Sequence, residues 1–398
     1  MGRNILVLTY WSYPDALVQT YTLPYLRIIR NILPEGSKLV LVTLEKENSS
    51  KEERIIEKGI YNISFASIPF GVKAILSWRK NISFLKKFIH ENNIDTIHTW
   101  CTPAGAIGYL ISKKTGVPLV LDSYEPHAEP MVETGTWKKG GIAFRILFRL
   151  EKKQTRHANY LIGVVSGMKE YAKTKYNYSG ENFFTKPACI DLNQFNLSHR
   201  KNPALLKKLN LEGKIVCVYA GKFGGLYLRE EVFHFFKKAF DHWGGRFTVL
   251  LLTSTPHDEI YSLCEHADFP KQNIRIEFVL PSKIQDYLGL GDFAFSAFKP
   301  VPSRKFCTPI KNGEYWAMGL PVIIPAGISE DSEIIASTHS GVVLKDLSET
   351  TMENAIREMD HILENNKDGK LSEQIHHLAI KHRNFTIAES VYGKIYGI

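Results

Sequence analysis

Short apolar runs alternate with longer amphipathic stretches along most of this chain, and this alternation restricts the fold more than any other feature. The apolar runs cover residues 4–11, 37–45, 94–100, 117–124 and 159–166, and then 214–221, 246–254, 274–280, 292–298 and 321–326. Continuous apolar runs of this length are typical of parallel strands buried on both faces, with helices as the crossovers between them. The pattern therefore predicts repeated βαβ units and an α/β fold.

The length of the chain predicts more than one domain, because 398 residues exceed what a single hydrophobic core usually serves. A polar segment at 196–213 separates the two series of apolar runs. We predict an N-terminal domain over 1–195, a C-terminal domain over 196–375, and a helix over 376–398 that packs back on the N-terminal domain. Both domains are expected to be Rossmann-like and to face each other across a deep ligand-binding cleft.

The composition excludes several classes of protein. Hydrophobic residues make up 44% of the chain and charged residues 23%, unlike collagen-like, coiled-coil or disordered chains. No apolar run reaches the ~18 residues that a membrane-spanning helix needs, so we expect a cytoplasmic protein. The five cysteines are scattered without a C-x-x-C pair, and neither a disulfide framework nor a metal site is predicted.

Positive charge is concentrated in the first half of the chain. Residues 1–195 contain 26 Lys and Arg against 17 Asp and Glu, a net +9, whereas residues 196–398 contain 24 of each sign. The excess lies mainly in two segments, 73–90 and 137–157, in which cations alternate with Trp, Phe, Leu and Ile at helical spacing. Such a charge imbalance predicts an anionic partner for the N-terminal half.

Two interpretations of the segments 73–90 and 137–157 stay open. Each segment suits a helix lying on an anionic membrane surface, with peripheral contact at the inner face of the cytoplasmic membrane. Alternatively, the apolar side chains pack into the domain core and the cations are solvated. Nucleic acid is not a predicted partner, because neither segment carries a helix-turn-helix or RNA-binding signature.

A glycine-rich turn follows the apolar run at 214–221. Gly221, Gly224 and Gly225 would let backbone N–H groups approach phosphate oxygens closely, at the start of a helix whose N-terminus favours negative charge. Lys222 and Arg229 would supply full positive charges. The spacing is neither G-x-G-x-x-G nor a Walker A sequence, so a tight turn without a ligand is the alternative.

The segment 305–327 is the most specific feature of the sequence. Thr308 and Pro309 are predicted to open a helix that ends at Gly319. Lys311 and Glu314 are three residues apart and therefore share one face of that helix. A cation and a carboxylate would project from the helix start, either toward a ligand or as an ordinary surface ion pair.

Here the residues resemble a known family. "KNGEYWAMGLPVII" resembles the K-x-x-E-y-x-A-x-G-x-P-V signature of retaining GT-B glycosyltransferases, in particular glycosyltransferase family 4. "VYAGKFGG" is similar to the phosphate loop of that family, and the segment 280–298 to its base-binding turn. Further segments at 186–195 and 332–344 match in the same order, so the resemblance covers most of residues 95–345.

The resemblance implies roles for residues of the C-terminal half. Lys222 and Lys311 would neutralise the diphosphate of a nucleotide-sugar donor, and Glu314 would hold the ribose. The other donor-binding residues implied are Gly221, Gly224, Gly225, Arg229, Pro281, Thr308 and Pro309. The first glutamate of the family's donor motif, which contacts the transferred sugar, is replaced here by Phe306. Members with an S-P-x-K variant of this segment also lack that glutamate.

In the N-terminal half, the segment 121–131 places Asp122, Glu125, His127 and Glu129 directly after a predicted strand. Polar groups at the carboxyl end of a strand are typical of ligand sites in α/β domains. The family resemblance implies that His127 contacts the transferred sugar. Glu125 and Glu129 are predicted on the acceptor side together with Asp15, which lies where family members often have Gly-Gly.

These observations predict a glycosyltransferase of the hexosyltransferase type. It would move a sugar from a nucleoside-diphosphate sugar to a hydroxyl of a glycan or lipid-linked acceptor, with retention and without a metal or other cofactor. Polysaccharide and glycolipid biosynthesis of the cell envelope is the expected setting. Two alternatives stay open: an enzyme like the nucleotide-sugar 2-epimerases, and a catalytically degenerate GT-B subunit that only binds.

Overall fold

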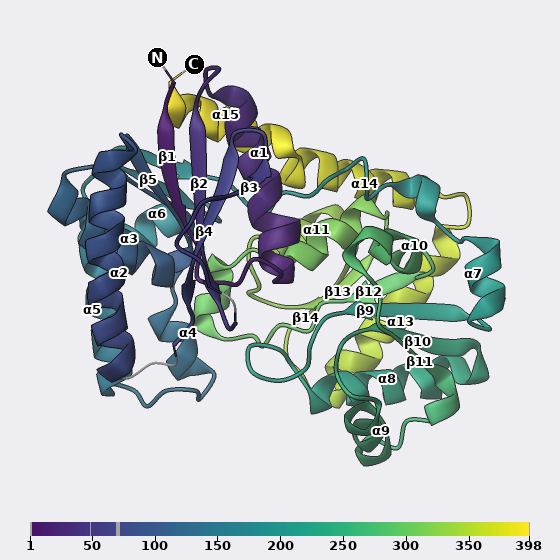
Figure 1. Cartoon of the computed structure of the whole chain (residues 1–398). Coiled ribbons are helices and arrows are strands. Elements are labelled where there is room, and N and C mark those ends of the chain that lie inside the picture. Colours follow the sequence, from purple (N-terminus) through teal and green to yellow (C-terminus); the bar gives the residue numbers. More distant parts are fainter. Residues whose placement is uncertain (1, 48, 69–71, 398) are drawn as a thin grey trace. The chain divides into compact units, whose positions relative to one another are not determined.

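The computed structural model describes the backbone of residues 2–47, 49–68 and 72–397, and the side chains of these residues except 72–76. The chain forms two compact units, each with its own sheet (Figure 1). Unit 1 comprises Met1–Val132, Trp137–Pro187 and Thr386–Ile398, and unit 2 comprises Glu133–Thr136 and Ala188–Phe385. The long segment of unit 2 therefore begins at Ala188, earlier than the predicted boundary at residue 196.

Unit 1 is built on an eight-stranded sheet of order β3-β4-β2-β1-β5-β6-β7-β8. The strands are β1 (Asn4–Leu8), β2 (Lys38–Glu45), β3 (Arg54–Glu57), β4 (Ile60–Ala66), β5 (Thr96–Trp100), β6 (Leu119–Tyr124), β7 (Tyr160–Gly163) and β8 (Phe183–Thr185). All neighbouring pairs are parallel except β3 with β4. The order reverses between β1 and β5, so the crevice at their carboxyl ends is where such a sheet binds ligands.

Helices connect the strands of unit 1. They are a π-helix η1 (Val18–Thr22), then α1 (Leu23–Ile32), α2 (Val72–Glu91), α3 (Cys101–Thr115), α4 (Ala128–Glu133), α5 (Ile142–His157), α6 (Met168–Tyr176) and, from the end of the chain, α15 (Phe385–Tyr396). The central strand β1 is buried from Ile5 to Leu8, as its continuous apolar sequence predicts.

Unit 2 contains a six-stranded parallel sheet of order β11-β10-β9-β12-β13-β14. Its strands are β9 (Ile215–Ala220), β10 (Phe247–Leu252), β11 (Ile274–Glu277), β12 (Phe293–Phe295), β13 (Val322–Pro325) and β14 (Gly341–Leu344). From β9, the strands β10 and β11 follow one another toward one edge of the sheet. The next strand, β12, pairs with the other side of β9. The reversal between β9 and β12 is the switch point of this sheet.

The helices of unit 2 cover this sheet and position its loops. The α-helices are α7 (Pro203–Lys208), α8 (Glu230–Trp243), α9 (His257–His266), α10 (Ile284–Leu288), α11 (Ile310–Ala317), α12 (Asp331–Thr338), α13 (Glu349–Asn365) and α14 (Lys370–Arg383), and the 3₁₀ turns are η2 (Leu197–His199), η3 (Gly244–Arg246), η4 (Lys271–Asn273), η5 (Pro281–Lys283) and η6 (Pro302–Phe306).

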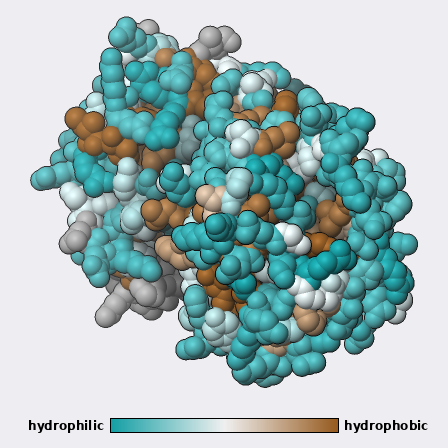
Figure 2. All heavy atoms as spheres, turned by 90° about the vertical axis from the view of Figure 1, so that its right-hand side faces the viewer, coloured by the Kyte–Doolittle hydropathy of each residue, from teal (hydrophilic) through white to brown (hydrophobic). Residues whose placement is uncertain are grey.

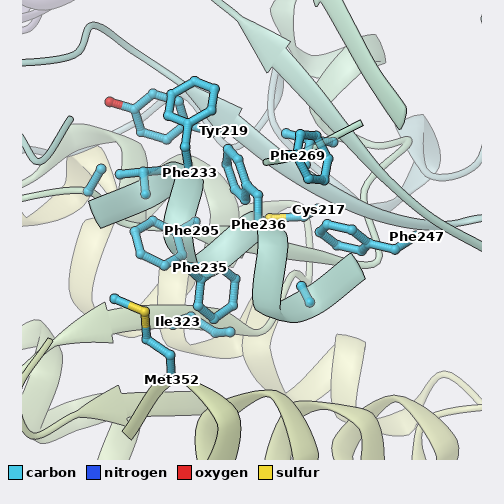
Figure 3. Close-up of a cluster of buried hydrophobic side chains, with 14 of the residues drawn as sticks. Cys217, Tyr219, Phe233, Phe235, Phe236, Phe247, Phe269, Phe295, Ile323 and Met352 are labelled. Carbon is cyan, nitrogen blue, oxygen red and sulfur yellow. The ribbon is translucent and has the colours of Figure 1, made fainter. Parts of the chain in front are cut away.

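An aromatic cluster packs α8 onto the sheet of unit 2 (Figure 3). Phe233, Phe235 and Phe236 of α8 are fully buried, and the ring of Phe235 lies 4.8 Å from that of Phe295 in β12. Burying such a side chain stabilises the fold by roughly 1.5–3 kcal/mol. This packing holds the start of α8, and the glycine loop before it, against the switch point.

The structure confirms the predicted α/β class and the ten predicted strands. Four strands were not predicted, namely β3, β4, β8 and β14. β3 is a short edge strand with charged ends, and β8 has only three residues, so neither shows an apolar run. The predicted terminal helix over 376–398 is in fact two helices, because Asn384 takes an extended conformation between α14 in unit 2 and α15 in unit 1.

No helix in the described part of the chain is long and apolar enough to cross a membrane. The face of the molecule drawn in Figure 2 is mostly hydrophilic, with hydrophobic side chains scattered over it in small patches. Isolated exposed apolar residues of this kind are normal on folded proteins.

Candidate functional site

The glycine loop of unit 2 follows β9 at the switch point of the sheet. Gly224 and Gly225 have φ angles of +80° and +61°, which glycine adopts at little cost. A Cβ atom on Gly221 would lie 2.9 Å from the hydroxyl of Tyr219, which donates a hydrogen bond to the carbonyl of Lys222. The turn therefore needs glycine at these positions.

Two backbone contacts hold this loop against the end of β12. The N–H of Leu228 donates to the carbonyl of Ala297 at 2.7 Å, and Tyr227 forms a β-bridge with Phe298. The side chain of Lys222 is exposed, and no ion pair joins it to any residue that the structure describes. Lys222 thus presents an uncompensated positive charge at the carboxyl edge of the sheet.

The Arg229 side chain lies beside the glycine loop, with its Cδ atom 3.7 Å from where a Cβ on Gly224 would be. It is the residue just before α8, and its guanidinium forms ion pairs with Glu259 of α9 at 3.1 Å and with Glu230 at 3.5 Å. Its positive charge is therefore compensated within unit 2. The sequence contains both glutamates, but only the structure shows that α9 brings Glu259 to the guanidinium.

Lys311 and Glu314 form an ion pair of 2.7 Å on the first turn of α11. The Glu314 residue is only 7% exposed, whereas the Lys311 ammonium lies at the surface. The next residue, Tyr315, accepts a hydrogen bond from the backbone N–H of Ala220 at 3.0 Å. Because Ala220 immediately precedes Gly221, this bond ties α11 to the end of the strand that leads into the glycine loop.

The start of α11 is anchored from α14. Arg383 is buried, donates to the Thr308 hydroxyl at 2.6 Å and pairs with the Asp331 carboxylate. Thr308 also accepts from the backbone N–H of Ala188 at 3.0 Å, and Asn312 donates to Asp331 at 2.8 Å. Burial raises the pKa of Asp331, and the Arg383 charge opposes this rise.

Thr308 and Pro309 differ from the predicted local geometry. Pro309 is the N-cap residue of α11, not a member of its first turn. The Thr308 hydroxyl oxygen accepts two hydrogen bonds from the protein, so Thr308 stabilises the loop before α11. Arg383 is a positioning residue that the sequence analysis did not identify. A glycine at position 313, inside α11, was the indirect sign of a close neighbour, since a Cβ atom there would lie 3.0 Å from the Arg383 side chain.

The loop before α11 contains a second arginine that sequence reasoning missed. Arg304 is 5% exposed, and no ion pair joins its guanidinium to any residue in the described part of the chain. It lies two residues before Phe306, the position where the resembling family has a carboxylate. Where the family has a negative charge, this loop therefore has Phe306, and a buried positive charge lies two residues before it.

The predicted base-binding turn follows β11 in the chain. Pro281 opens η5, and its carbonyl accepts from the side chain of Gln194 at 2.8 Å. Phe278 and Leu280, directly before this turn, are exposed apolar side chains. The turn thus has a fixed backbone and an apolar surface.

In unit 1, the structure places His127 at the start of α4, just after β6. The buried Glu151 carboxylate of α5 accepts the backbone N–H groups of His127 and Ala128, each at 2.9 Å, and the hydroxyl of Tyr176 at 2.9 Å. Burial raises the pKa of Glu151 to about 7, and these hydrogen bonds oppose the rise. Glu151 of α5, the next helix along the chain, therefore positions the His127 backbone.

The predicted acceptor-side residues have structural contacts. Glu129 accepts a hydrogen bond from Tyr171 and pairs with Lys175 at 2.9 Å. Asp15 accepts from the backbone N–H of Leu17 at 2.8 Å and so caps the turn that leads into η1. The Glu125 carbonyl accepts from the Thr102 hydroxyl at 2.8 Å, which joins the loop after β6 to the first turn of α3.

Asp122, the fourth polar group of this segment, belongs to a buried network. Its carboxylate lies 3.1 Å from the Lys186 ammonium, 3.2 Å from His98 and 2.6 Å from the hydroxyl of Tyr392 in α15. Burial alone would raise the pKa of Asp122, but Lys186 and these hydrogen bonds lower it to about 2. The network fixes α15 to the sheet of unit 1.

The two basic segments differ in the structure. Within 77–90 of α2, the apolar side chains Ile82, Leu85, Phe88 and Ile89 are buried in unit 1, and every Lys and Arg is exposed; the side chains of 73–76 lie outside the described ones. These buried side chains fit the interpretation in which the apolar side chains of this segment pack into the domain core. In α5, by contrast, Ile142 and Ile146 are exposed.

Among the described residues, no group of three or more His, Cys, Asp or Glu side chains could hold a metal ion. The cationic side chains at the switch point of unit 2 are Lys222 and Lys311. Amines and glycine N–H groups suit an anionic ligand with several oxygen atoms, such as a diphosphate.

Comparisons with known proteins agree with this reading of the fold. No protein-family model and no curated protein sequence matches the chain. Sucrose-phosphate synthase from Thermosynechococcus elongatus is similar in structure, with a TM-score of 0.75 and 14% sequence identity over 99% of this chain and 98% of that chain. HepE from Anabaena, solved in complex with UDP, has a TM-score of 0.71 and 13% identity over 100% of both chains.

WaaG, a glycosyltransferase involved in lipopolysaccharide biosynthesis, has a TM-score of 0.72 and 13% identity over 99% of this chain and 100% of that chain. Identities this low show the fold and not the activity. The chain therefore has the GT-B fold, with two parallel-sheet α/β domains, that these glycosyltransferases share.

Proposed function

We propose that this protein is a glycosyltransferase that moves a sugar from a nucleoside-diphosphate sugar to a hydroxyl of a glycan or lipid-linked acceptor. The observation that carries the proposal is the switch point of unit 2, where the hydrogen bond from Ala220 to Tyr315 joins the glycine loop to the Lys311–Glu314 pair. The structural relatives that bind UDP and UDP-glucose support a donor of this class.

The proposed donor contacts follow from charge. The diphosphate carries negative charge that Lys222 and Lys311 neutralise together with the N–H groups of the glycine loop. Glu314 accepts hydrogen bonds from the ribose hydroxyls. The nucleobase lies on the apolar turn at Phe278, Leu280 and Pro281.

In the proposed reaction, the bond between the anomeric carbon and the diphosphate oxygen breaks, and both bonding electrons stay on the diphosphate. The acceptor hydroxyl oxygen bonds to the anomeric carbon, and its proton passes to a phosphate oxygen of the leaving group. Lys222 and Lys311 stabilise the charge that develops on the diphosphate, which is the largest electrostatic demand of the reaction. The amines perform this task without a metal ion.

Unit 1 supplies the acceptor side in this proposal. His127 contacts the transferred sugar, and Glu151 holds the His127 backbone in place. Glu125, Glu129 and Asp15 belong to the same acceptor side, where their structural hydrogen bonds shape the loops. We further propose that the enzyme retains the anomeric configuration and belongs to glycosyltransferase family 4. Its role is in the synthesis of cell-envelope polysaccharide or glycolipid.

The experiment that tests the donor class is thermal unfolding of the purified protein with UDP, GDP, ADP and CMP and their sugar conjugates, in buffer containing EDTA. A ligand at about 100 times its Kd stabilises the folded state by ~2.7 kcal/mol. We expect one nucleotide class to raise the Tm selectively. The responding donor is then incubated with lipid-linked and free glycan acceptors, and the anomeric configuration of the product is read by NMR.

The outcomes separate the alternatives. Donor binding with transfer to an acceptor supports the proposal. Donor binding without transfer or hydrolysis indicates a degenerate binding subunit, for which Phe306 at the position of the missing glutamate is the favouring observation. Conversion of the donor into its 2-epimer indicates the epimerase. No response to any nucleotide contradicts the donor site itself.

A further inference from the structure

A basic pocket lies on unit 1, lined by residues of α3 and α5. These two helices pack against each other. Its volume is about 730 Å³. Apart from Tyr109, every lining residue is basic: Lys113, Arg149, Lys152, Lys153, Arg156 and His157. No acidic side chain lines the pocket, and it belongs to a different unit from the glycine loop.

The positive charge of this pocket is not neutralised by the protein. None of its five Lys and Arg side chains forms an ion pair with any residue that the structure describes. His157 contacts the Ser112 hydroxyl at 2.9 Å, and burial together with the Lys113 charge lowers its pKa. The five uncompensated cations repel one another, and a bound anion would relieve that repulsion.

Stabilisation of helix ends accounts for only part of these cations. Lys113 lies in the last turn of α3 and Arg156 in the last turn of α5, where positive charge favours the helix C-terminus. Arg149, Lys152 and Lys153 lie one turn or more before the end of α5. Their convergence on one pocket therefore needs another explanation.

The exposed face of α5 continues from this pocket into an apolar end. Ile142 and Ile146 are 78% and 44% exposed, and they stand on the same helical face as Arg149 and Lys153 at spacings of three, four and seven residues. Three residues from Ile146 to Arg149 span ~5 Å along the helix. An apolar surface thus borders directly on the cationic pocket.

We propose that the pocket formed by α3 and α5 binds a phosphate-bearing anion, and that this phosphate is a lipid headgroup whose chains meet Ile142 and Ile146. Arginine forks bind phosphate oxygens in pairs, and lysines add charge without a fixed geometry. Basic pockets beside an apolar helix face suit anionic lipids. This site is independent of the donor-binding site and of the transferase assignment.

The test uses the full-length protein and the variant Arg149→Gln/Lys153→Gln/Arg156→Gln. All three side chains are exposed, so the fold is expected to survive, and circular dichroism and Tm check it. The matched control is Lys207→Gln/Lys208→Gln/Lys381→Gln, which removes the same charge from exposed, unpaired positions of unit 2. The probes are inorganic pyrophosphate, phosphatidylcholine vesicles, and equimolar phosphatidylcholine–phosphatidylglycerol vesicles.

We expect co-sedimentation with the phosphatidylglycerol vesicles and not with phosphatidylcholine alone. The pocket variant should bind at least tenfold more weakly, equivalent to about 1.4 kcal/mol, and the control variant should bind like the wild type. A second variant, Ile142→Asn/Ile146→Asn, should weaken vesicle binding and leave pyrophosphate binding unchanged.

Calorimetry with pyrophosphate separates the two sources of phosphate. A pyrophosphate site that is lost in the pocket variant, without vesicle binding, supports the anion site and assigns it to a free phosphate compound. If the wild type and the pocket variant bind pyrophosphate equally, the pyrophosphate binds outside the α3–α5 pocket. If the wild type also fails to bind vesicles, the proposal is overturned. Equal loss of vesicle binding in the pocket and control variants also overturns it.

Discussion

The hydroxyl of Tyr315 in α11 accepts a hydrogen bond from the backbone N–H of Ala220, the last residue of β9. Both groups are buried, and each stands beside a residue of the candidate donor site: Glu314 before Tyr315, and Gly221 after Ala220. The bond therefore ties α11, which carries Glu314, to the strand that leads into the glycine loop, although the two segments lie almost a hundred positions apart in the sequence.

Tyr315→Phe is expected to leave the Ala220 N–H buried without an acceptor. The cost is ~1–3 kcal/mol of unfolding free energy, since a buried donor loses its partner. Urea unfolding measures this loss, and nucleotide binding should weaken in the same variant. Tyr261→Phe on α9 is the control, because the Tyr261 hydroxyl forms no hydrogen bond with any residue that the structure describes. Equal stability of the two variants would contradict the proposed role.

Lys311→Ala is expected to lower turnover by at least about tenfold, or ~1.4 kcal/mol of barrier, with the fold intact. The physical reason is the loss of positive charge beside the diphosphate as it leaves. Transfer assays with the donor found by thermal unfolding measure this effect. Lys305→Ala removes an exposed cation from η6, the turn before α11, and should have a smaller effect. Unchanged turnover in Lys311→Ala would remove Lys311 from the donor site.

Arg383→Met is expected to destabilise unit 2 by ~3–5 kcal/mol, because it leaves the buried Asp331 carboxylate without its partner. Adding Asp331→Asn removes the uncompensated charge and should restore part of the stability. Denaturant unfolding of the two variants measures both effects. Lys381→Met on the same helix is exposed and should change stability little. A double variant no more stable than Arg383→Met would show that charge is not the cause.

The Glu151 carboxyl predicts a specific pH dependence of stability. Its pKa is raised from 4.5 to about 7 in the folded protein, so its stabilising contribution is present below pH 4.5 and is lost as the pH rises through about 7. The loss is ~3 kcal/mol, at about 1.4 kcal/mol for each pKa unit.

Glu151→Gln cannot ionise and should lack this component. The measurement is the difference in unfolding free energy between wild type and Glu151→Gln, followed across that pH range. A difference that is independent of pH would mean that Glu151 has an ordinary pKa in the folded state. The other titrating groups cancel in this comparison because both proteins contain them.

Much of the fold was predictable from the sequence because its determinants are local. The runs that became β1, β2, β9 and β10 are mostly apolar, and strands buried on both faces need such a composition. β3 and β8 were not predicted, because a short strand at the edge of a sheet buries few side chains and so needs no apolar run. The family-like motif placed Lys311 and Glu314 on one helical turn, where the structure has them paired.

Other features depend on residues that only the tertiary structure brings together. Arg383 reaches Thr308 from a helix at the end of unit 2, and Glu151 reaches the His127 backbone from the next helix along the chain. Arg229 fits a phosphate loop by its position in the sequence, yet α9 supplies Glu259 to pair with it.

The sequence by itself determined the two α/β domains, the strands at their centres and the helix that bears Lys311 and Glu314, because hydrophobic periodicity and turn chemistry act between near neighbours in the chain. The tertiary structure decided which charges are paired and which remain uncompensated, from Arg229 and Arg383 to the basic pocket of α3 and α5. The pairing of a charge depends on its distance in space to other charges, and packing between distant segments sets that distance.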